Sequence, residues 1–250
     1  MKRFNLIVLL AVVLAACSSK PEKLDVYLIG DSTMANKKAE VYPETGWGQV
    51  VNQYFDDQVI VHNHAINGRS SKSFIDEGRW QVVLDSLNAG DYVLIQFGHN
   101  DQKDKDSTRY TEPFGAYSDN LAKYVKESRE KGAIPILLTS IVRRKFDENG
   151  QLIDTHKDYP VAMRQVVKQL DVPLIDLQKI TEEFVQSLGD AKSKELYLWT
   201  EPSDRFPEGR QDDTHLKVAG AKKVAELATS VLAKLPLGLA DHVLLVKEKD

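Results

Sequence analysis

Short apolar runs alternate with longer amphipathic segments along most of this chain. Five of the runs are rich in Val, Ile and Leu, which is typical of buried strands, and they occupy residues 24–29, 59–64, 92–97, 134–139 and 172–177. In the other segments apolar residues recur at spacings of three and four, which predicts helices over residues 47–55, 73–87, 114–131, 160–170, 177–188 and 217–232. Strands that alternate with helices build a parallel sheet covered on both faces. The pattern therefore predicts a three-layer, doubly wound α/β sandwich around a mostly parallel five-stranded sheet.

The remaining segments are less regular. Residues 198–213 contain Pro202, Pro207 and Gly209, so we expect a loop that lies against the domain. Residues 239–246 are apolar, and they form either a final edge strand or a packed extension. We find no internal repeat, and we assign residues 24–250 to a single domain whose regular part ends near residue 236.

The N-terminus has the pattern of a secretory signal. Two basic residues precede a short apolar run, residues 6–14, which is too short to span a membrane. Residues 14–17, Leu-Ala-Ala-Cys, resemble the bacterial lipoprotein box, in which the cysteine is lipidated and becomes the first mature residue. We therefore predict a signal peptide over residues 1–16, a lipid on Cys17 and a tether over residues 17–23. The alternative is that Cys17, the one cysteine of the chain, is an ordinary buried thiol.

Composition and charge exclude several classes of protein. With 42% hydrophobic residues among 250, the chain can build a full-sized core, which excludes intrinsic disorder. The formal net charge is −4, and Lys and Arg are scattered rather than gathered in a stripe, which argues against a nucleic-acid partner. A lipid-anchored protein on the periplasmic or outer face of a bacterial membrane also meets few nucleotide cofactors. We therefore do not expect a kinase or a dehydrogenase.

Polar residues that follow the predicted strands are the candidates for catalysis, because ligands bind beyond the carboxyl ends of the strands in an open α/β sheet. Gly30-Asp31-Ser32 follows the first strand. The glycine allows a tight turn, and Ser32 on that turn can present its hydroxyl as a nucleophile with its own backbone N–H beside it. Taken alone, the tripeptide is explained more simply as a turn in which Asp31 or Ser32 caps the next helix.

Three further positions carry groups suited to catalysis. Gly68, after the second strand, allows a backbone N–H to approach a ligand, and Asn100, after the third, carries a side-chain N–H. Near the end of the chain Asp212 and His215 are three residues apart, so the carboxylate can orient the imidazole and the imidazole can take the proton of a serine. Each position has a structural alternative, namely a turn glycine, an Asx turn and a cap on the last helix.

Taken together and in this order, these motifs resemble the sequence blocks of the SGNH hydrolases. The stretches at residues 30–33, 46–48, 67–74 and 97–101 further resemble the rhamnogalacturonan acetylesterase branch, whose members deacetylate pectin of plant cell walls. The resemblance implies a flavodoxin-like SGNH hydrolase fold. It also implies an esterase that needs no metal and no organic cofactor.

The resemblance assigns a role to each matching residue. It makes Ser32 the nucleophile, His215 the base and Asp212 the residue that orients the base, and it places the N–H groups of Ser32, Gly68 and Asn100 in an oxyanion hole. Asp213 is also acidic, but the spacing of the family motif selects Asp212.

Side chains beside these motifs are candidates for substrate binding. Trp47 stands between two glycines, so we expect its ring in the pocket, whereas Trp80 fits the core better. Arg69 and Lys72 closely follow Gly68, and an arginine can hold a uronate carboxylate with two parallel hydrogen bonds. We therefore expect an acidic glycan, the alternative being that Arg69 pairs with a neighbouring acid.

Three histidines outside the catalytic pair are expected to have structural roles. His62 and His64 alternate on one predicted strand and point to one face, but no third ligand accompanies them at a useful spacing, so we expect no metal site. His99 lies inside the third motif, and we expect it to be a structural hydrogen-bonding residue near the site.

These observations predict a serine esterase that releases acetate from an acetylated polysaccharide, pectic rhamnogalacturonan by the resemblance, through an acetyl-enzyme. Two other functions remain. A lipid or other acyl esterase on the same scaffold needs an apolar groove, whereas the loops over residues 101–109 and 143–157 are polar and charged. A non-catalytic glycan-binding lipoprotein has no use for a base paired with a serine.

Overall fold

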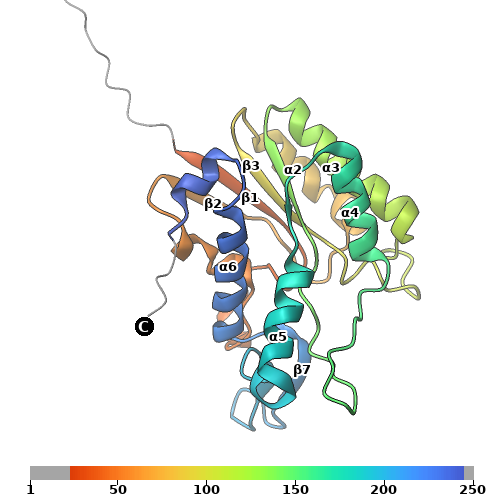
Figure 1. Ribbon diagram of the computed structural model, residues 1–250, viewed down its shortest axis with the longest axis vertical. Coiled ribbons are helices and arrows are strands. Elements are labelled where there is room, and N and C mark those ends of the chain that lie inside the picture. The colour runs from red at the N-terminus through yellow and green to blue at the C-terminus, as the bar shows by residue number, and fades with distance from the viewer. Residues whose placement is uncertain (1–22, 245–250) are drawn as a thin grey trace, which may run out of the picture.

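The computed structural model describes residues 23–244, and its centre is a parallel sheet with the strand order β2-β1-β3-β4-β5 (Figure 1). The strands are β1 (Leu24–Gly30), β2 (Val59–Asn63), β3 (Tyr92–Gln96), β4 (Ile134–Leu138) and β5 (Leu174–Ile175). Each strand coincides with one of the five apolar runs, so the predicted sheet is confirmed. The strand order is that of a flavodoxin-like doubly wound fold.

Helices cover both faces of this sheet. They are α1 (Ser71–Asp76), α2 (Arg79–Ser86), α3 (Ser118–Glu130), α4 (Tyr159–Leu170), α5 (Leu177–Ser193) and α6 (Val218–Leu232). Apolar residues of α5 and α6 pack on one face and those of α1 to α4 on the other, which gives three layers. Figure 1 shows α6 on one side of the sheet and α3 and α4 on the opposite side. The predicted α/β sandwich is therefore confirmed.

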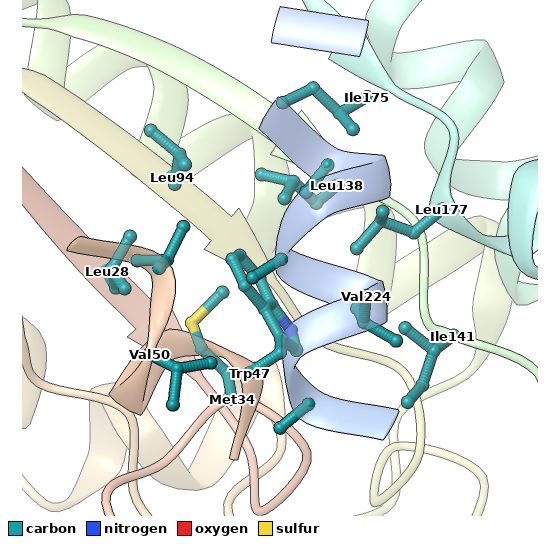
Figure 2. Close-up of a cluster of buried hydrophobic side chains, with 14 of the residues drawn as sticks. Leu28, Met34, Trp47, Val50, Leu94, Leu138, Ile141, Ile175, Leu177 and Val224 are labelled. Carbon is teal, nitrogen blue, oxygen red and sulfur yellow. The ribbon is translucent and has the colours of Figure 1, made fainter. Parts of the chain in front are cut away.

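Strand β1 shows how the sheet separates two hydrophobic cores. Val26 and Leu28 belong to the core under α5 and α6, while Tyr27 and Ile29 belong to the core under α1 to α4. Figure 2 shows Leu28 in the first core, together with Val224 of α6. Because both faces are buried, the strand is apolar on both, and this is why it appears in the sequence as a continuous apolar run.

Three of the predicted helices are divided in the structure. The segment 114–131 begins with a π-helical turn, Pro113–Tyr117, ahead of α3. The segment 73–87 belongs to two helices, α1 and α2, because Gly78 between them adopts a left-handed conformation with φ of +70°. The segment 47–55 forms two 3₁₀ turns, Trp47–Gln49 and Val51–Tyr54, instead of one α-helix. Apolar residues three apart share a face in a 3₁₀ turn as well as in an α-helix, so periodicity alone does not separate the two.

The loop predicted over residues 198–213 is wrong at both of its ends. β6 (Tyr197–Thr200) and β7 (Arg210–Leu216) pair as an antiparallel hairpin, and the loop proper runs only over residues 201–209. β7 reads Arg-Gln-Asp-Asp-Thr-His-Leu and has no alternation of apolar and polar residues. The sequence therefore carried no strand signal at this position.

The C-terminal segment is a packed extension rather than an edge strand. It forms a 3₁₀ turn over Gly238–His242, and the N–H of buried Leu239 donates to the hydroxyl of Tyr92 at 3.2 Å. Val243 makes a single antiparallel bridge with Phe55. Residues 245–250 lie outside the described part of the chain.

The predicted signal peptide over residues 1–16, Cys17, and the tether up to residue 22 also lie outside the described residues. Across residues 23–244 we find no helix that is both long enough and apolar enough to cross a membrane. The lipid anchor on Cys17 therefore stays a prediction.

Candidate active site

Strand β1 delivers a serine to the carboxyl edge of the sheet on a tight turn. The strand ends at Gly30, where a Cβ atom would lie only 2.7 Å from the carbonyl oxygen of Gln96 on β3. The next residue, Asp31, is fully buried, and its Oδ1 accepts hydrogen bonds from the N–H and the hydroxyl of Thr33, both at 2.9 Å. These contacts hold the turn, and Ser32 lines a cavity beside it.

A β-bulge presents Asp212 and His215 together. Between two neighbouring residues of β6 the pairing jumps from Leu216 to Asp212, which leaves residues 213–215 out of register. Oδ1 of Asp212 accepts the N–H groups of Thr214 and His215 at 2.8 and 2.9 Å, and these bonds stabilise the bulge. Asp212 and His215, which we expected to meet, therefore do so on a bulged strand.

Ser32, His215 and Asp212 form one hydrogen-bonded chain. Nε2 of His215 lies 2.9 Å from Oγ of Ser32, and Nδ1 of His215 lies 2.7 Å from Oδ2 of Asp212. Burial opposes the ionisation of Asp212, but the hydrogen bonds and the charge of His215 hold the pKa of this carboxyl well below its ordinary value. Ionised Asp212 accepts a hydrogen bond from Nδ1–H, which leaves the Nε2 lone pair of His215 for the serine hydroxyl.

The three N–H donors expected in an oxyanion hole line the same cavity. The backbone N–H groups of Ser32 and Gly68 donate no hydrogen bond to any group within residues 23–244. Gly68 has a φ of +77°, which glycine adopts without strain. Nδ2 of Asn100 donates to the carbonyl oxygen of Arg69 at 3.0 Å, and because this amide has two protons, the second remains available. Such donors can hold negative charge that develops on a substrate oxygen beside Ser32.

The cavity at this edge of the sheet has a volume of about 490 Å³. Polar and charged residues and one glycine form its walls, namely Ser32, Asn67, Gly68, His99, Asn100, Lys103, Arg143, Asp212, Thr214 and His215. No sequence motif singled out Lys103 or Arg143. Both belong to the polar loops over residues 101–109 and 143–157, and spacing along a loop does not indicate which of its residues turn toward a cavity.

His99 is a buried hydrogen-bonding residue beside the site. Its Nδ1 lies 3.2 Å from Oδ2 of Asp31. Burial disfavours the ionised form of Asp31, but His99, through its charge and its hydrogen bond, lowers the pKa of this carboxyl to about 2. Burial also lowers the pKa of His99, so at neutral pH the ring is uncharged and the hydrogen bond places its proton on Nδ1. Nε2 of His99 has no partner within residues 23–244.

The expectation that Trp47 faces the pocket is wrong. Its side chain is fully buried, and Figure 2 shows it in the core with Met34. The indole Nε1 donates to Oε1 of Gln96 at 2.6 Å, so its polar atom is satisfied inside the protein. The flanking glycines serve close packing instead, because a Cβ atom at Gly46 would lie 2.1 Å from the carbonyl oxygen of Ala35.

Arg69 and Lys72, which we expected to bind substrate, contact other groups of the protein. Nε of Arg69 lies 3.0 Å from Oε2 of Glu77, in a neighbouring hollow, so the structure shows the alternative in which Arg69 pairs with an acid. Nζ of Lys72 donates to the carbonyl oxygen of Ser107 at 2.7 Å. Neither side chain lines the cavity beside Ser32, so neither is placed to hold a substrate there.

His62 of β2 and His64, which follows the strand, have structural contacts. Nε2 of His62 lies 2.5 Å from Oδ1 of Asp25, and the rings of His62 and His64 both stack on Tyr27. Nowhere in residues 23–244 do three or more His, Cys, Asp or Glu side chains come close enough to hold a metal ion.

Comparisons with known proteins cover most of the chain. Residues 28–223 match the GDSL-like lipase/acylhydrolase family. The chain is similar to the rhamnogalacturonan acetylesterase RhgT of Bacillus subtilis, with 42% identity over 88% of this chain and 94% of that protein. It is also similar to the probable rhamnogalacturonan acetylesterase YesY of the same organism, with 35% identity over 90% of this chain and 98% of that protein. Among solved structures, the protein YxiM of Bacillus subtilis has a TM-score of 0.72 and 26% identity over 84% of this chain and 56% of that one.

Proposed function

The chain belongs to the GDSL-like lipase/acylhydrolase family and is a carboxylic ester hydrolase, and we propose that it removes O-acetyl groups from pectic rhamnogalacturonan. The observation that carries this proposal is the hydrogen-bonded chain of Ser32, His215 and Asp212. The relatives RhgT and YesY support the class of substrate, since RhgT is named a rhamnogalacturonan acetylesterase and YesY a probable one. The partner is thus an acetylated polysaccharide or oligosaccharide.

Acylation begins with proton transfer along the hydrogen-bonded chain. Nε2 of His215 takes the hydroxyl proton of Ser32 while Oγ attacks the carbonyl carbon of the acetyl group. Asp212 remains ionised and stabilises the imidazolium that forms. The carbonyl oxygen becomes an oxyanion, which accepts hydrogen bonds from the N–H groups of Ser32, Gly68 and Asn100.

The same histidine then completes both half-reactions. Nε2–H of His215 protonates the sugar oxygen as its bond to the acetyl carbon breaks, so the sugar leaves as a neutral alcohol and the acetyl group stays on Oγ of Ser32. A water molecule next gives its proton to Nε2 and attacks the acetyl carbon. The proton returns to Ser32 when acetate leaves, which restores the enzyme.

The character of the cavity favours acetyl groups on sugars over fatty acyl chains. Asn67, Lys103 and Arg143 contribute amide and charged groups to its walls, whereas a long acyl chain needs an apolar groove. The hydrogen bond between His215 and Ser32 likewise favours an enzyme over a glycan-binding lipoprotein, because binding alone does not need a base beside a hydroxyl.

We further propose that the protein is exported and held on a bacterial membrane by a lipid on Cys17. The support is the sequence, in which a signal-like segment over residues 1–16 leads directly to this cysteine. A tether over residues 17–23 would then join the lipid to β1, which begins at Leu24. The esterase would act close to the membrane surface.

Acetate release by the wild type and by Ser32→Ala tests the proposed activity. We expect the wild type to have its highest kcat/KM on acetylated rhamnogalacturonan, in a panel that also contains acetylated xylan and 4-nitrophenyl acetate. Ser32→Ala is expected to lose at least about 10⁴-fold in kcat, with an unchanged circular dichroism spectrum. If a folded Ser32→Ala variant keeps more than a tenth of the wild-type rate, Ser32 is not the nucleophile. If the wild type prefers another polymer, rhamnogalacturonan is not the substrate.

A further inference from the structure

The cavity beside Ser32 carries an excess of positive charge. Lys103 and Arg143 line it, and Asp212 is the one carboxylate among its described lining residues. Asp212 is already occupied, because its oxygens accept hydrogen bonds from Nδ1 of His215 and from backbone N–H groups. The cavity therefore contains two cations that no carboxylate of its own walls is free to neutralise.

Arg143 is held in place by uncharged groups. Nη1 donates to Oε1 of Gln102 at 3.2 Å and to the carbonyl and hydroxyl oxygens of Thr155 at 3.3 and 3.1 Å, and Nη2 donates to the carbonyl oxygen of His99 at 3.3 Å. Burial lowers the pKa of Arg143 and the negative charge of Asp31 raises it, and the guanidinium stays charged at neutral pH. A largely buried charge to which no carboxylate of residues 23–244 hydrogen-bonds destabilises the folded protein, a penalty that the longer-range attraction of Asp31 reduces. An anionic ligand would remove this penalty when it binds.

Lys103 brings a second cation to the cavity from the segment that carries the oxyanion donor. Its backbone N–H donates to the carbonyl oxygen of Asn100 at 3.2 Å, which places it one turn after that residue. The nearby acid, Asp106, pairs with Arg109 at 2.5 Å. Loss of solvent and the positive charges of Arg109 and Arg143 lower the pKa of Lys103, whereas the negative charges of Asp106 and Asp31 raise it. The acid that acts most strongly on Lys103, Asp106, is thus shared with another cation.

We propose that Lys103 and Arg143 together bind the carboxylate of a uronic acid residue in the substrate, and so select acidic over neutral glycans. The inference rests on the proposed function, because it uses the same cavity. The fixed guanidinium of Arg143 offers N–H groups in the planar arrangement that suits a carboxylate. Lys103 supplies a flexible point charge that can follow the ligand. A neutral glycan leaves both cations without a carboxylate in the cavity to bind.

The selection is measured by comparing two substrates. The selectivity is the ratio of kcat/KM on an acetylated, galacturonate-containing oligosaccharide to kcat/KM on an acetylated neutral xylo-oligosaccharide. Lys103→Met removes one charge-assisted hydrogen bond, so this ratio is expected to fall about 10-fold, mainly through a higher KM for the acidic substrate. Lys103→Glu reverses the charge and is expected to lower the ratio further.

Lys105→Met is the matched control. Lys105 is exposed, lies two residues further along the same loop and does not line the cavity. Its variant changes the net charge of the protein as Lys103→Met does, and it is expected to keep the wild-type ratio. A ratio within twofold of the wild type in Lys103→Met overturns the proposal, and so does an equal fall in both variants.

Binding without turnover separates this inference from the proposed function. In calorimetric titrations we expect Ser32→Ala to bind a deacetylated rhamnogalacturonan oligosaccharide more tightly than a neutral xylo-oligosaccharide. Added salt is expected to weaken the binding of the acidic oligosaccharide but not that of the neutral one. When Lys103→Met is added to Ser32→Ala, the affinity for the acidic oligosaccharide is expected to fall about 10-fold. If this pattern holds without acetate release by the wild type, the proposed function fails and the carboxylate site stands. If acetate is released but both oligosaccharides bind alike, or neither binds, the carboxylate site fails.

Discussion

Asp212→Asn changes one atom of the hydrogen-bonded chain from an acceptor to a donor. The amide oxygen can keep the bonds from the N–H groups of Thr214 and His215, which are 2.8 and 2.9 Å long, so the bulge persists. The new NH₂ group replaces Oδ2, the atom that lies 2.7 Å from Nδ1 of His215. Two donors do not bond to each other, so Nδ1 becomes an acceptor and the ring proton moves to Nε2. An imidazole with its proton on Nε2 cannot accept the proton of Ser32.

The expected loss of activity is large, and the expected loss of stability is small. The variant has both the wrong tautomer and no negative charge beside the imidazolium, so we expect kcat to fall about 10⁴-fold, which corresponds to about 5.5 kcal/mol in activation free energy. The backbone hydrogen bonds of the bulge remain, so the free energy of unfolding is expected to change by about 1 kcal/mol or less.

Asp213→Asn is the matched control, because it changes the adjacent carboxylate in the same way. Oδ1 of Asp213 accepts from Nε of Arg144 at 2.6 Å and from Nε1 of Trp199 at 2.8 Å, and Asp213 does not line the cavity. Arg144 also pairs with Asp190. We therefore expect kcat to stay within a few fold of the wild type and Tm to fall modestly, as Arg144 loses one of its two acidic partners.

Hydrolysis of 4-nitrophenyl acetate, with thermal unfolding followed by circular dichroism, distinguishes the two variants. The acetyl group of this substrate reaches Ser32 without needing a glycan site, so the rate reports on the chemistry at Ser32 and not on glycan binding. If Asp212→Asn kept more than a tenth of the wild-type kcat, or if Asp213→Asn were the less active variant, the pairing of His215 with Asp212 would be refuted as the source of catalysis.

Three further expectations concern other parts of the molecule. Asn100→Ala removes one oxyanion donor, so kcat on 4-nitrophenyl acetate is expected to fall about 10²- to 10³-fold in steady-state assays, and an unchanged kcat contradicts that role. Cys17→Ser is expected to move the protein from the membrane to the soluble exported fraction and to abolish labelling by a fatty acid; labelling that persists contradicts the anchor. Burial raises the pKa of Asp101 to about 7, against hydrogen bonds from Ser71 and Thr111 that lower it. Because this pKa is about 3.9 in an unfolded chain, the associated stability is fully present below that pH and is lost as the pH rises through about 7. Between pH 5 and pH 8 the free energy of urea unfolding is therefore expected to fall more in the wild type than in Asp101→Asn, and parallel curves contradict the shift.

The central sheet could be predicted because burial on both faces leaves a local signal. β1 and β3 lie between two layers of helices, so their side chains are almost all apolar, and such runs are visible without knowing their partners. β5 lies at the edge of the sheet, and only Leu174 and Ile175 pair with β4, although the apolar run covers residues 172–177. The length of an edge strand depends on the neighbour it pairs with, which a run of apolar residues does not report.

The catalytic candidates could be identified one by one, but their contact could not be derived. Ser32 and His215 are separated by 183 positions in the chain, and only the folded domain brings their side chains within 2.9 Å. The bulge that aims Asp212 and His215 exists because β7 pairs out of register with β6. Its own residues carry no strand signal. Spacing alone did not separate a catalytic pair from a helix cap, and the family resemblance supplied the roles.

The sequence by itself determined the five strands of the central sheet and most of the helices that cover it, and it marked the polar residues that follow the strands, because burial and turn geometry act on neighbours along the chain. The tertiary structure alone decided which cations face the cavity. Arg69 and Lys72 closely follow an expected oxyanion donor in the sequence yet turn to other partners, whereas Lys103 and Arg143 come from two separate loops and line the same cavity. A surface side chain points where the hydrogen bonds and charges of other elements direct it, and those elements become its neighbours only when the chain has folded.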